Sequence, residues 1–212
     1  MKAVLVAAGD IAQGDWFNRQ LDEADLLVAV DGGLRHILAA GRLPDLLVGD
    51  MDSALEADLE RAAGVERVTF PRDKDDTDLE LAVREAVAAG ATKLTLAATL
   101  GSRRDQELAN LLLAARLRRE NRLTVSLAGA GTMVWPLDTA DELLLPCPAG
   151  TVFSVVALET GCRVSIAGAL YDVSNQTLGF GSGLGISNSV RLDARVRADA
   201  GLMLLLAVTD AV

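Results

Sequence analysis

Histidine and cysteine are scarce in this sequence: its 212 residues include one histidine, His36, and two cysteines, Cys147 and Cys162. A single histidine excludes metal sites built from several imidazoles, and any histidine-dependent triad would have to use His36. This residue follows Asp31-Gly32-Gly33 in a segment expected to be helical, so a packing or surface role is favoured. Two cysteines are too few for a disulfide framework, and their spacing is not that of a zinc site. We expect both to be small buried side chains.

Aromatic residues and positive charge are also scarce. Phe, Trp and Tyr make up 3% of the chain and apolar residues 50%, so a core of Ala, Val and Leu is expected. The formal net charge is −10, which argues against a broad basic face for nucleic acid. A polyphosphate ligand would therefore need metal ions or locally placed arginines.

Apolar runs long enough to span a membrane are absent as well. The opening segment 1–8 is too short for a signal-peptide core with its cleavage site, and the run 202–208 is far below membrane-spanning length. We therefore expect a soluble cytoplasmic protein that binds neither membranes nor nucleic acids.

Up to about residue 128, short apolar runs alternate with helical patterns, which is typical of parallel β-α-β units. Thr77 or Asp76 can cap the helix that begins near Leu79, and Gly90 can end it. The expected strands are 3–8, 26–30, 46–48, 65–70, 94–98 and 124–128, and the expected helices are 17–21, 34–40, 55–63, 79–89 and 108–119.

After about residue 129 the pattern changes to strands separated by Pro, Gly, Asn and Asp turns, with no evident helix. The expected strands are 132–137, 142–145, 151–158, 163–167, 190–198 and 201–208. We therefore predict two domains. Residues 1–128 are expected to form an α/β domain with a parallel, Rossmann-like sheet, and residues 129–212 an all-β sandwich domain.

Acidic residues collect in the loops that follow the expected strands. Asp31-Gly32-Gly33 follows the second strand and Gly49-Asp50-Met51-Asp52-Ser53 the third. Residues 73–78 follow the fourth strand, and residues 101–106 follow the fifth. Ligands of an open parallel sheet bind outside the carboxyl ends of its strands, so these loops are expected to meet at one edge.

Each aspartate has a structural alternative, because Asp side chains commonly cap helices and close turns. Several carboxylates at one end of a sheet, however, repel one another unless cations neutralise them. Carboxylate oxygens suit Mg²⁺, which also binds phosphate oxygens. One of Arg103 and Arg104 is expected to bind a phosphate. The sequence thus predicts a magnesium-dependent site for a nucleotide polyphosphate, built on Asp50, Asp52, Asp75, Asp78 and Asp105.

The standard nucleotide fingerprints are absent from the sequence. Gly9 and Gly14 have the spacing of a P-loop, but Asp15-Trp16 stands where Lys-Ser/Thr is required. The glycine-rich stretch 179–185 lies in the β half with no helix pattern after it, and we expect a flexible hairpin there.

Taken together, the loop motifs resemble those of the thiamine pyrophosphokinase family. One motif alone would be weak evidence, but the ordered set covers nearly the whole chain. The matching stretches are Asp31-Gly32-Gly33, Pro44-Asp45 with Gly49-Asp50-Met51-Asp52-Ser53, Lys74-Asp75-Asp76-Thr77-Asp78, Gly101-Ser102-Arg103-Arg104-Asp105-Gln106, Leu108-Ala109-Asn110, Gly168-Ala169-Leu170-Tyr171 and Gly185-Ile186-Ser187-Asn188.

The resemblance implies an N-terminal domain that binds ATP and Mg²⁺, a C-terminal β-sandwich, and a homodimer with thiamine bound where the two protomers meet. The implied reaction moves the terminal pyrophosphoryl group of ATP to the hydroxyl of thiamine, giving thiamine diphosphate and AMP. Either Asp78 or Asp105 would accept the hydroxyl proton. The implied Mg²⁺ ligands are Asp50, Asp52 and Asp78, with Asp75 and Asp105 in support.

Further site residues are implied by the same resemblance. Those for ATP and its phosphates are Asp31, Gly32, Gly33, Lys74, Thr77, Arg103, Gln106 and Asn110. Those for thiamine are Tyr171, Ser187 and Asn188.

The chain departs from the usual family pattern at Asp172-Val173 and Ser189, close in sequence to the implied thiamine residues, so other functions stay open. One alternative is a pyrophosphokinase for another hydroxymethyl heterocycle, such as a pterin. A second is a non-catalytic sensor of thiamine or its diphosphate, although a sensor needs no full magnesium site. A third is a metal-dependent nucleotide hydrolase.

Overall fold

The computed structural model describes residues 1–51, 54–70, 75–101 and 103–209. Among these residues the chain divides into two compact units: unit 1 comprises 1–113 and 123–131, and unit 2 comprises 114–122 and 132–209. Residues 114–122 thus group with the strands of the second half, whereas the sequence analysis assigned them to the first.

Unit 1 contains a parallel sheet. The strands pair in the order β4-β3-β2-β1-β5-β6, and each of these pairings is parallel, as the alternation of strand and helix patterns predicted. The bounds are β1 (Lys2–Val6), β2 (Leu26–Val30), β3 (Leu46–Val48), β4 (Glu66–Val68), β5 (Lys93–Ala97) and β6 (Thr124–Gly129).

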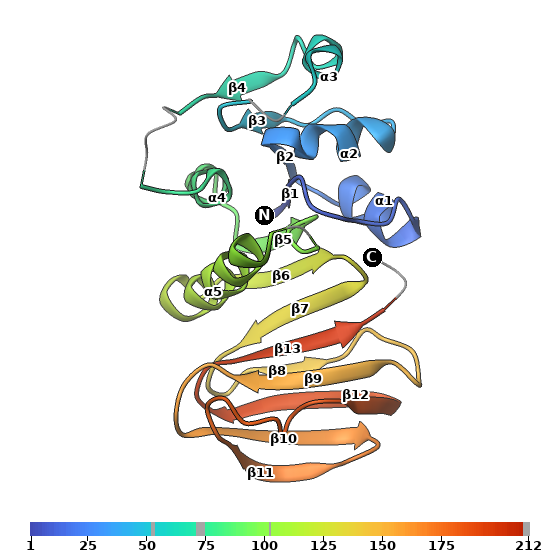
Figure 1. Ribbon diagram of the computed structural model, residues 1–212, viewed down its shortest axis with the longest axis vertical. Helices are drawn as coiled ribbons and strands as arrows, with labels where there is room; N and C mark the ends of the chain where they lie inside the picture. Colours follow the sequence, from blue (N-terminus) through green and yellow to red (C-terminus); the bar gives the residue numbers. More distant parts are fainter. Residues whose placement is uncertain (52–53, 71–74, 102, 210–212) are drawn as a thin grey trace. The chain divides into compact units, whose positions relative to one another are not determined.

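Helices cover both faces of this sheet. Figure 1 shows α1 and α2 on one face and α4 on the other. On the first face Val4 and Val6 pack with Phe17 and Ile37 in one buried cluster, whereas Leu5 points to the opposite face.

No helix in the described ranges has the length and apolar character needed to cross a membrane. The bounds are α1 (Asp15–Asp22), η1 (Asp31–Gly33, a 3₁₀ turn), α2 (Leu34–Ala39), α3 (Glu56–Arg61), α4 (Asp78–Ala88) and α5 (Arg104–Asn121).

The start of α4 is determined by a capping box. Thr77 Oγ1 accepts a hydrogen bond from the Glu80 N–H, and Glu80 Oε2 accepts one from the Thr77 N–H, both at 3.2 Å. These two bonds satisfy amide groups that have no partner within the helix. Of the two caps predicted from the sequence, Thr77 is therefore the N-cap, and Asp78 becomes the first helical residue.

Unit 2 contains antiparallel strands, which pair in the order β11-β10-β12-β9-β13-β7. The long strand β12 pairs with β9 at its start and with β8 near its end. The bounds are β7 (Thr132–Leu137), β8 (Glu142–Leu144), β9 (Val152–Ala157), β10 (Cys162–Ala169), β11 (Val173–Leu178), β12 (Asn188–Ala200) and β13 (Met203–Val208).

The strand β11 was not predicted from the sequence. Four of its residues, 174–177, are polar and exposed, and Asn175 has a φ of +50° beside a shift in register with β10. Periodicity detects a strand only when one face is buried, and β11 lies at the end of the strand order with little buried surface. It therefore gives no alternating signal.

The two cysteines differ in their surroundings. Cys162 is buried, and its thiol donates a hydrogen bond to the Leu202 carbonyl oxygen (3.2 Å). Cys147 is only half-buried, and that burial raises the pKa of its thiol. The expectation of burial is confirmed for Cys162 and is wrong for Cys147.

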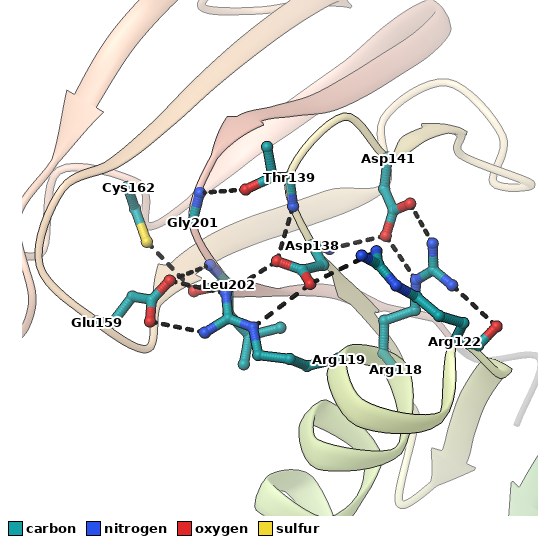
Figure 2. Close-up of polar contacts among 10 residues, drawn as sticks. All are labelled: Arg118, Arg119, Arg122, Asp138, Thr139, Asp141, Glu159, Cys162, Gly201 and Leu202. Carbon is teal, nitrogen blue, oxygen red and sulfur yellow. Dashed lines mark hydrogen bonds and ion pairs between the residues drawn. The ribbon is translucent and has the colours of Figure 1, made fainter.

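The end of α5 forms an ion-pair cluster with turns of unit 2 (Figure 2). Arg119 is the centre of this arginine cluster: its Nη2 lies 2.8 Å from Asp138 Oδ1, and its Nη1 lies 2.7 Å from Glu159 Oε2. Arg118 Nε donates to Asp141 Oδ2 at 2.6 Å. The hydrogen bond from Arg119 lowers the pKa of Glu159 to about 2, and it also lowers the pKa of Asp138.

The carboxylates of this arginine cluster also hold the backbone of neighbouring turns. The Leu202 N–H donates to Glu159 Oε1 (2.9 Å), and the Thr139 N–H donates to Asp138 Oδ1 (2.8 Å). The cluster thus links the last turns of α5 to the β7–β8, β9–β10 and β12–β13 connections (Figure 2).

Candidate functional site

A pocket of about 470 Å³ lies at the carboxyl ends of the parallel strands of unit 1. The strand order changes direction at β1, because β2 lies on one side of β1 and β5 lies on its other side. Open parallel sheets bind ligands at such a point. Six site residues named from the sequence line it: Asp31, Asp50, Thr77, Asp78, Gln106 and Asn110.

The Asp31-Gly32-Gly33 motif forms a tight turn at the end of β2. Asp31 has a φ of +47°, a conformation that few side chains adopt and that Asp tolerates. A Cβ on Gly33 would lie 1.9 Å from the Val6 carbonyl oxygen, so only glycine allows this turn to pack against the end of β1. The motif therefore brings Asp31 to the pocket.

The loop after β3 wraps around the Asp31 carboxylate. A Cβ on Gly49 would lie 1.8 Å from Asp31 Oδ1, and Gly49 has a φ of +133°, so this position also requires glycine. The Met51 N–H donates a long hydrogen bond to the same oxygen (3.4 Å). Asp50, between these two residues, is thereby placed in the pocket lining.

The carboxylates in the pocket repel one another. Burial, followed by the charge of Asp78 and a hydrogen bond with it, raises the pKa of Asp31 to about 7, and Asp50 contributes in the same direction. At neutral pH Asp31 therefore carries a proton for part of the time. Burial and the neighbouring carboxylates thus both disfavour the ionised form of Asp31.

The carboxylates that line the pocket are oxygen donors of the kind that a hard divalent cation binds. A cation would relieve the same repulsion as a proton and leave the carboxylates ionised, and oxygen ligands are those that Mg²⁺ prefers. Of the predicted ligands, Asp50 and Asp78 line the pocket, whereas Asp52 lies outside the described residues. Within the described ranges, no three Asp, Glu, His or Cys side chains form a group that could hold a metal ion.

We expect the stability of the protein in EDTA to fall as the pH rises from about 4 to about 7. The folded-state pKa of Asp31, about 7, lies above its ordinary value of 3.8. The contribution of protonated Asp31 to stability is therefore complete below its unfolded-state pKa. This contribution is lost as the pH rises through its folded-state pKa. Melting temperatures of the wild type and Asp31→Asn from pH 4 to 8 test this. Equal slopes in the two proteins would contradict the assignment.

Residues of α5 line the pocket on one helical face. Gln106 and Asn110 are one turn apart, and Asn110 Nδ2 donates to the Thr99 carbonyl oxygen (2.9 Å), which fixes the orientation of its amide. Arg103 and Asp105, which precede them, are exposed and pair with each other at 2.5 Å. Neither belongs to the pocket lining.

The remaining predicted residues of this half have varied positions. Asp75 is exposed and is not part of the pocket lining. Gly32 and Gly33 are buried in the turn after β2. Lys74 lies outside the described residues.

The sequence analysis missed the apolar wall of the pocket. These residues carry no reactive group, so residue type gave no signal. Ala7 and Ala8 fell within the expected strand 3–8. In the structure β1 ends at Val6, so these two residues lie at the edge of the sheet where ligands bind. The missed residues are Ala7, Ala8, Val30, Leu79 and Ala109.

The implied thiamine residues lie together in unit 2. Asn188 is 8% exposed, and its Oδ1 accepts from the Tyr171 N–H (3.0 Å) while its Nδ2 donates to the Tyr171 carbonyl oxygen (2.8 Å). Ser187 has a φ of +63°, and its N–H donates to Ser154 Oγ (3.1 Å). Asn188 thus holds the connection between β10 and β11, and the Tyr171 side chain is exposed.

Two family profiles match the sequence. Residues 17–127 match "Thiamin pyrophosphokinase, catalytic domain", and residues 142–203 match "Thiamin pyrophosphokinase, vitamin B1 binding domain". A sequence comparison with curated proteins gives no match.

The fold is similar to that of solved thiamine pyrophosphokinases. The Bacillus subtilis enzyme matches with a TM-score of 0.86 and 23% identity, over 99% of this chain and 100% of that one. The Candida albicans enzyme matches with a TM-score of 0.83 and 12% identity, over 99% of this chain and 89% of that one. The yeast enzyme matches with a TM-score of 0.81 and 14% identity, over 98% and 86% of the two chains. At these identities the likeness shows a shared fold.

Proposed function

Because the chain belongs to the thiamin pyrophosphokinase family, we infer that it transfers the pyrophosphoryl group of ATP to the hydroxyl of thiamine. The products are thiamine diphosphate and AMP. The observation that carries this inference is that both family profiles match in one chain, over residues 17–127 and 142–203. The part for catalysis and the part for the vitamin are both present.

We propose that ATP binds with its phosphates in the acidic pocket of unit 1. Pyrophosphoryl transfer depends mainly on positioning and on neutralising charge. Mg²⁺ would be held by Asp50, Asp52 and Asp78, with Asp75 and Asp105 in support, and when bound it would neutralise the phosphate oxygens and the departing AMP. A carboxylate, Asp78 or Asp105, accepts the proton that the thiamine hydroxyl loses.

Other side chains of unit 1 orient the nucleotide in this proposal. Gln106 and Asn110 supply amide groups from one face of α5. Asp31, Gly32 and Gly33 shape the edge after β2, and Thr77 lies where the capped end of α4 meets the pocket. Lys74 and Arg103 are proposed to reach phosphate oxygens, and Arg103 would first have to exchange Asp105 for the phosphate.

An assay for AMP separates this function from its alternatives. Purified protein is incubated with ATP and Mg²⁺ alone, with thiamine, and with a hydroxymethyl pterin. AMP formed only with thiamine supports the proposed reaction, and AMP formed only with the pterin assigns another acceptor. Phosphate released without an acceptor indicates a hydrolase. Thiamine binding without AMP formation indicates a sensor.

The second half is proposed to be a β-sandwich domain, residues 129–212, that binds thiamine and forms a homodimer, whereas residues 1–128 form the ATP-binding domain with its Rossmann-like sheet. Six large apolar side chains between residues 170 and 192 are exposed, which supports the proposed interface, because apolar surface left in water is a common feature of association sites. Light scattering at micromolar concentration tests the assembly. An active monomer would refute it. The exposed residues are Leu170, Tyr171, Phe180, Leu184, Ile186 and Leu192.

Truncating Ser187 and Asn188 should have different effects. We expect Ser187→Ala to raise KM for thiamine with little change in kcat, as happens when a group binds ground and transition states equally. Asn188→Ala should in addition lower the melting temperature, because it removes both hydrogen bonds to Tyr171. Thiamine KM, ATP KM and melting temperature are measured on both variants. An unchanged thiamine KM in Ser187→Ala would contradict its assignment.

A further inference from the structure

The wall of the pocket formed by Ala7 and Ala8 continues into a loop that α2 holds from outside. Arg35 Nη2 donates a hydrogen bond to the Ala8 carbonyl oxygen (2.7 Å). His36 Nε2 lies 2.9 Å from the carbonyl oxygen of the next residue, Gly9. Two consecutive side chains of α2 therefore bind two consecutive carbonyls of the loop between β1 and α1.

The role of each His36 nitrogen follows from its partner. A carbonyl oxygen can only accept, so Nε2 carries the proton and donates to Gly9. Nδ1 is then an acceptor for the Gln13 side-chain amide, at 3.5 Å. Burial lowers the pKa of His36, which favours this neutral form at neutral pH. Both ring nitrogens are thus directed at the loop 8–13.

The same loop is held on its other side by the segment that follows β5. The Gly9 N–H donates to the Ala98 carbonyl oxygen (2.8 Å), and the Asp10 N–H donates to the Leu100 carbonyl oxygen (3.1 Å). A Cβ on Gly9 would lie 2.5 Å from the Ala98 oxygen, so the loop approaches closely only because residue 9 is glycine. The backbone beside the pocket is therefore held from two directions.

We propose that Arg35 and His36 are positioning residues for the nucleotide. They fix the Ala8 and Gly9 carbonyls and thereby keep the Ala7-Ala8 wall in the shape that the nucleotide requires. This proposal rests on the proposed function, in which this pocket takes ATP. The turn that places Asp31 in the pocket leads directly into Arg35 and His36, so one short segment shapes two neighbouring walls.

A purely structural role for the two residues predicts a different result. It predicts a lower melting temperature with unchanged affinity for ATP, because the fold would weaken while the folded molecules kept their pocket. A positioning role predicts weaker binding of ATP in molecules that remain folded, with no effect on thiamine. The affinity for ATP therefore distinguishes the two.

The experiment compares Arg35→Ala, His36→Asn and His36→Gln with the control Arg42→Ala. Arg42 is a nearby arginine whose Nη2 pairs with Asp22 at 2.5 Å and which is not part of the pocket lining. Calorimetric binding of ATP with Mg²⁺ in the absence of thiamine is measured first. KM for each substrate, kcat and melting temperature are then measured on the same samples.

We expect Arg35→Ala and His36→Asn to weaken ATP binding about fivefold to tenfold, the scale of one lost hydrogen bond. Thiamine KM should stay unchanged and kcat should fall less than about threefold, since the contact acts on binding. His36→Gln should resemble the wild type, because a glutamine amide nitrogen reaches about as far as Nε2. Arg42→Ala should also resemble it.

Wild-type ATP affinity in Arg35→Ala and His36→Asn would overturn the proposal, as would equal losses in His36→Gln and His36→Asn. If Arg35→Ala does not fold, the two His36 variants decide the question, since they differ only in reach. A wild type that binds ATP but forms no AMP with thiamine would instead refute the proposed function. The two failures are therefore distinguishable.

Discussion

Replacing Asp78 by Asn is expected to lower kcat for thiamine diphosphate formation at least about a hundredfold, the scale of losing a key charge-stabilising group. The substitution keeps the size of the side chain but removes the charge that a cation would use. Because Asp78 repels Asp31 in the pocket, its neutralisation should leave the melting temperature equal or higher. A loss of activity could then not be attributed to unfolding.

A loss of kcat of the same size is expected for Asp50→Asn and Asp52→Asn. Added Mg²⁺ should restore kcat only partly. Asp76→Asn is the matched control, because Asp76 lies in the same segment as Asp78 but pairs with Arg84 at 2.7 Å. Its kcat should stay within about threefold of the wild type, as for an ordinary surface substitution. Near-wild-type turnover in all three site variants would end the assignment of the metal ligands.

Of the substitutions considered, Arg119→Met is expected to lower the free energy of unfolding most, by about 3 kcal/mol. It leaves the largely buried carboxylate of Asp138 without its main partner. The Asp138 side chain is 9% exposed, and Arg119 also bridges to Glu159. The two tryptophans lie in different units, Trp16 in unit 1 and Trp135 in unit 2. In a Trp16→Phe background the tryptophan fluorescence therefore comes from Trp135, and monitoring it during denaturation reports on the unfolding of unit 2.

Arg195→Met provides the control for this experiment. Arg195 pairs with Glu142 at 3.3 Å, but both side chains are about half exposed, at 57% and 47%. Such a surface pair contributes at most about 1 kcal/mol. Equal destabilisation by the two substitutions would show that burial of Asp138 has no special effect.

The arginine cluster also predicts a response to acid. The pKa of Glu159, about 2, lies below its ordinary value of 4.5, and that of Asp138 is lowered as well. Their stabilisation is therefore present above the unfolded-state values and is lost as the pH falls toward about 2. Arg119→Met should lose less stability than the wild type over this range.

The parallel sheet and the position of its pocket could be predicted because both depend on local patterns. Apolar runs and helical periodicity located the strands and helices of the first half, and the rule that ligands bind at the carboxyl ends of strands brought Asp31, Asp50 and Asp78 together. The capping of α4 by Thr77 was also readable, since it depends on residues three positions apart.

Side-chain partners could not be predicted, because they depend on segments that are distant in sequence. Nothing in the sequence indicates that Asn188 holds the backbone of Tyr171, or that Arg119 pairs with Glu159, forty residues further on. The same limit applies to His36. Its type and position suggested a packing or surface role, whereas its contact with Gly9 depends on how β1 ends beside α2.

The division of α5 between the two units limits where the chain can be cut into separately folding parts. The catalytic family profile ends at residue 127 and so includes Arg118 and Arg119, whereas Glu159 falls within the vitamin-binding profile. A gene crossover just after residue 127 would give the second half, with Asp138 and Glu159, to a new host without Arg118 and Arg119. Asp138 would then be left largely buried with no cation beside it. The two halves are therefore expected to be inherited together, unless the recipient also receives the last turns of this helix.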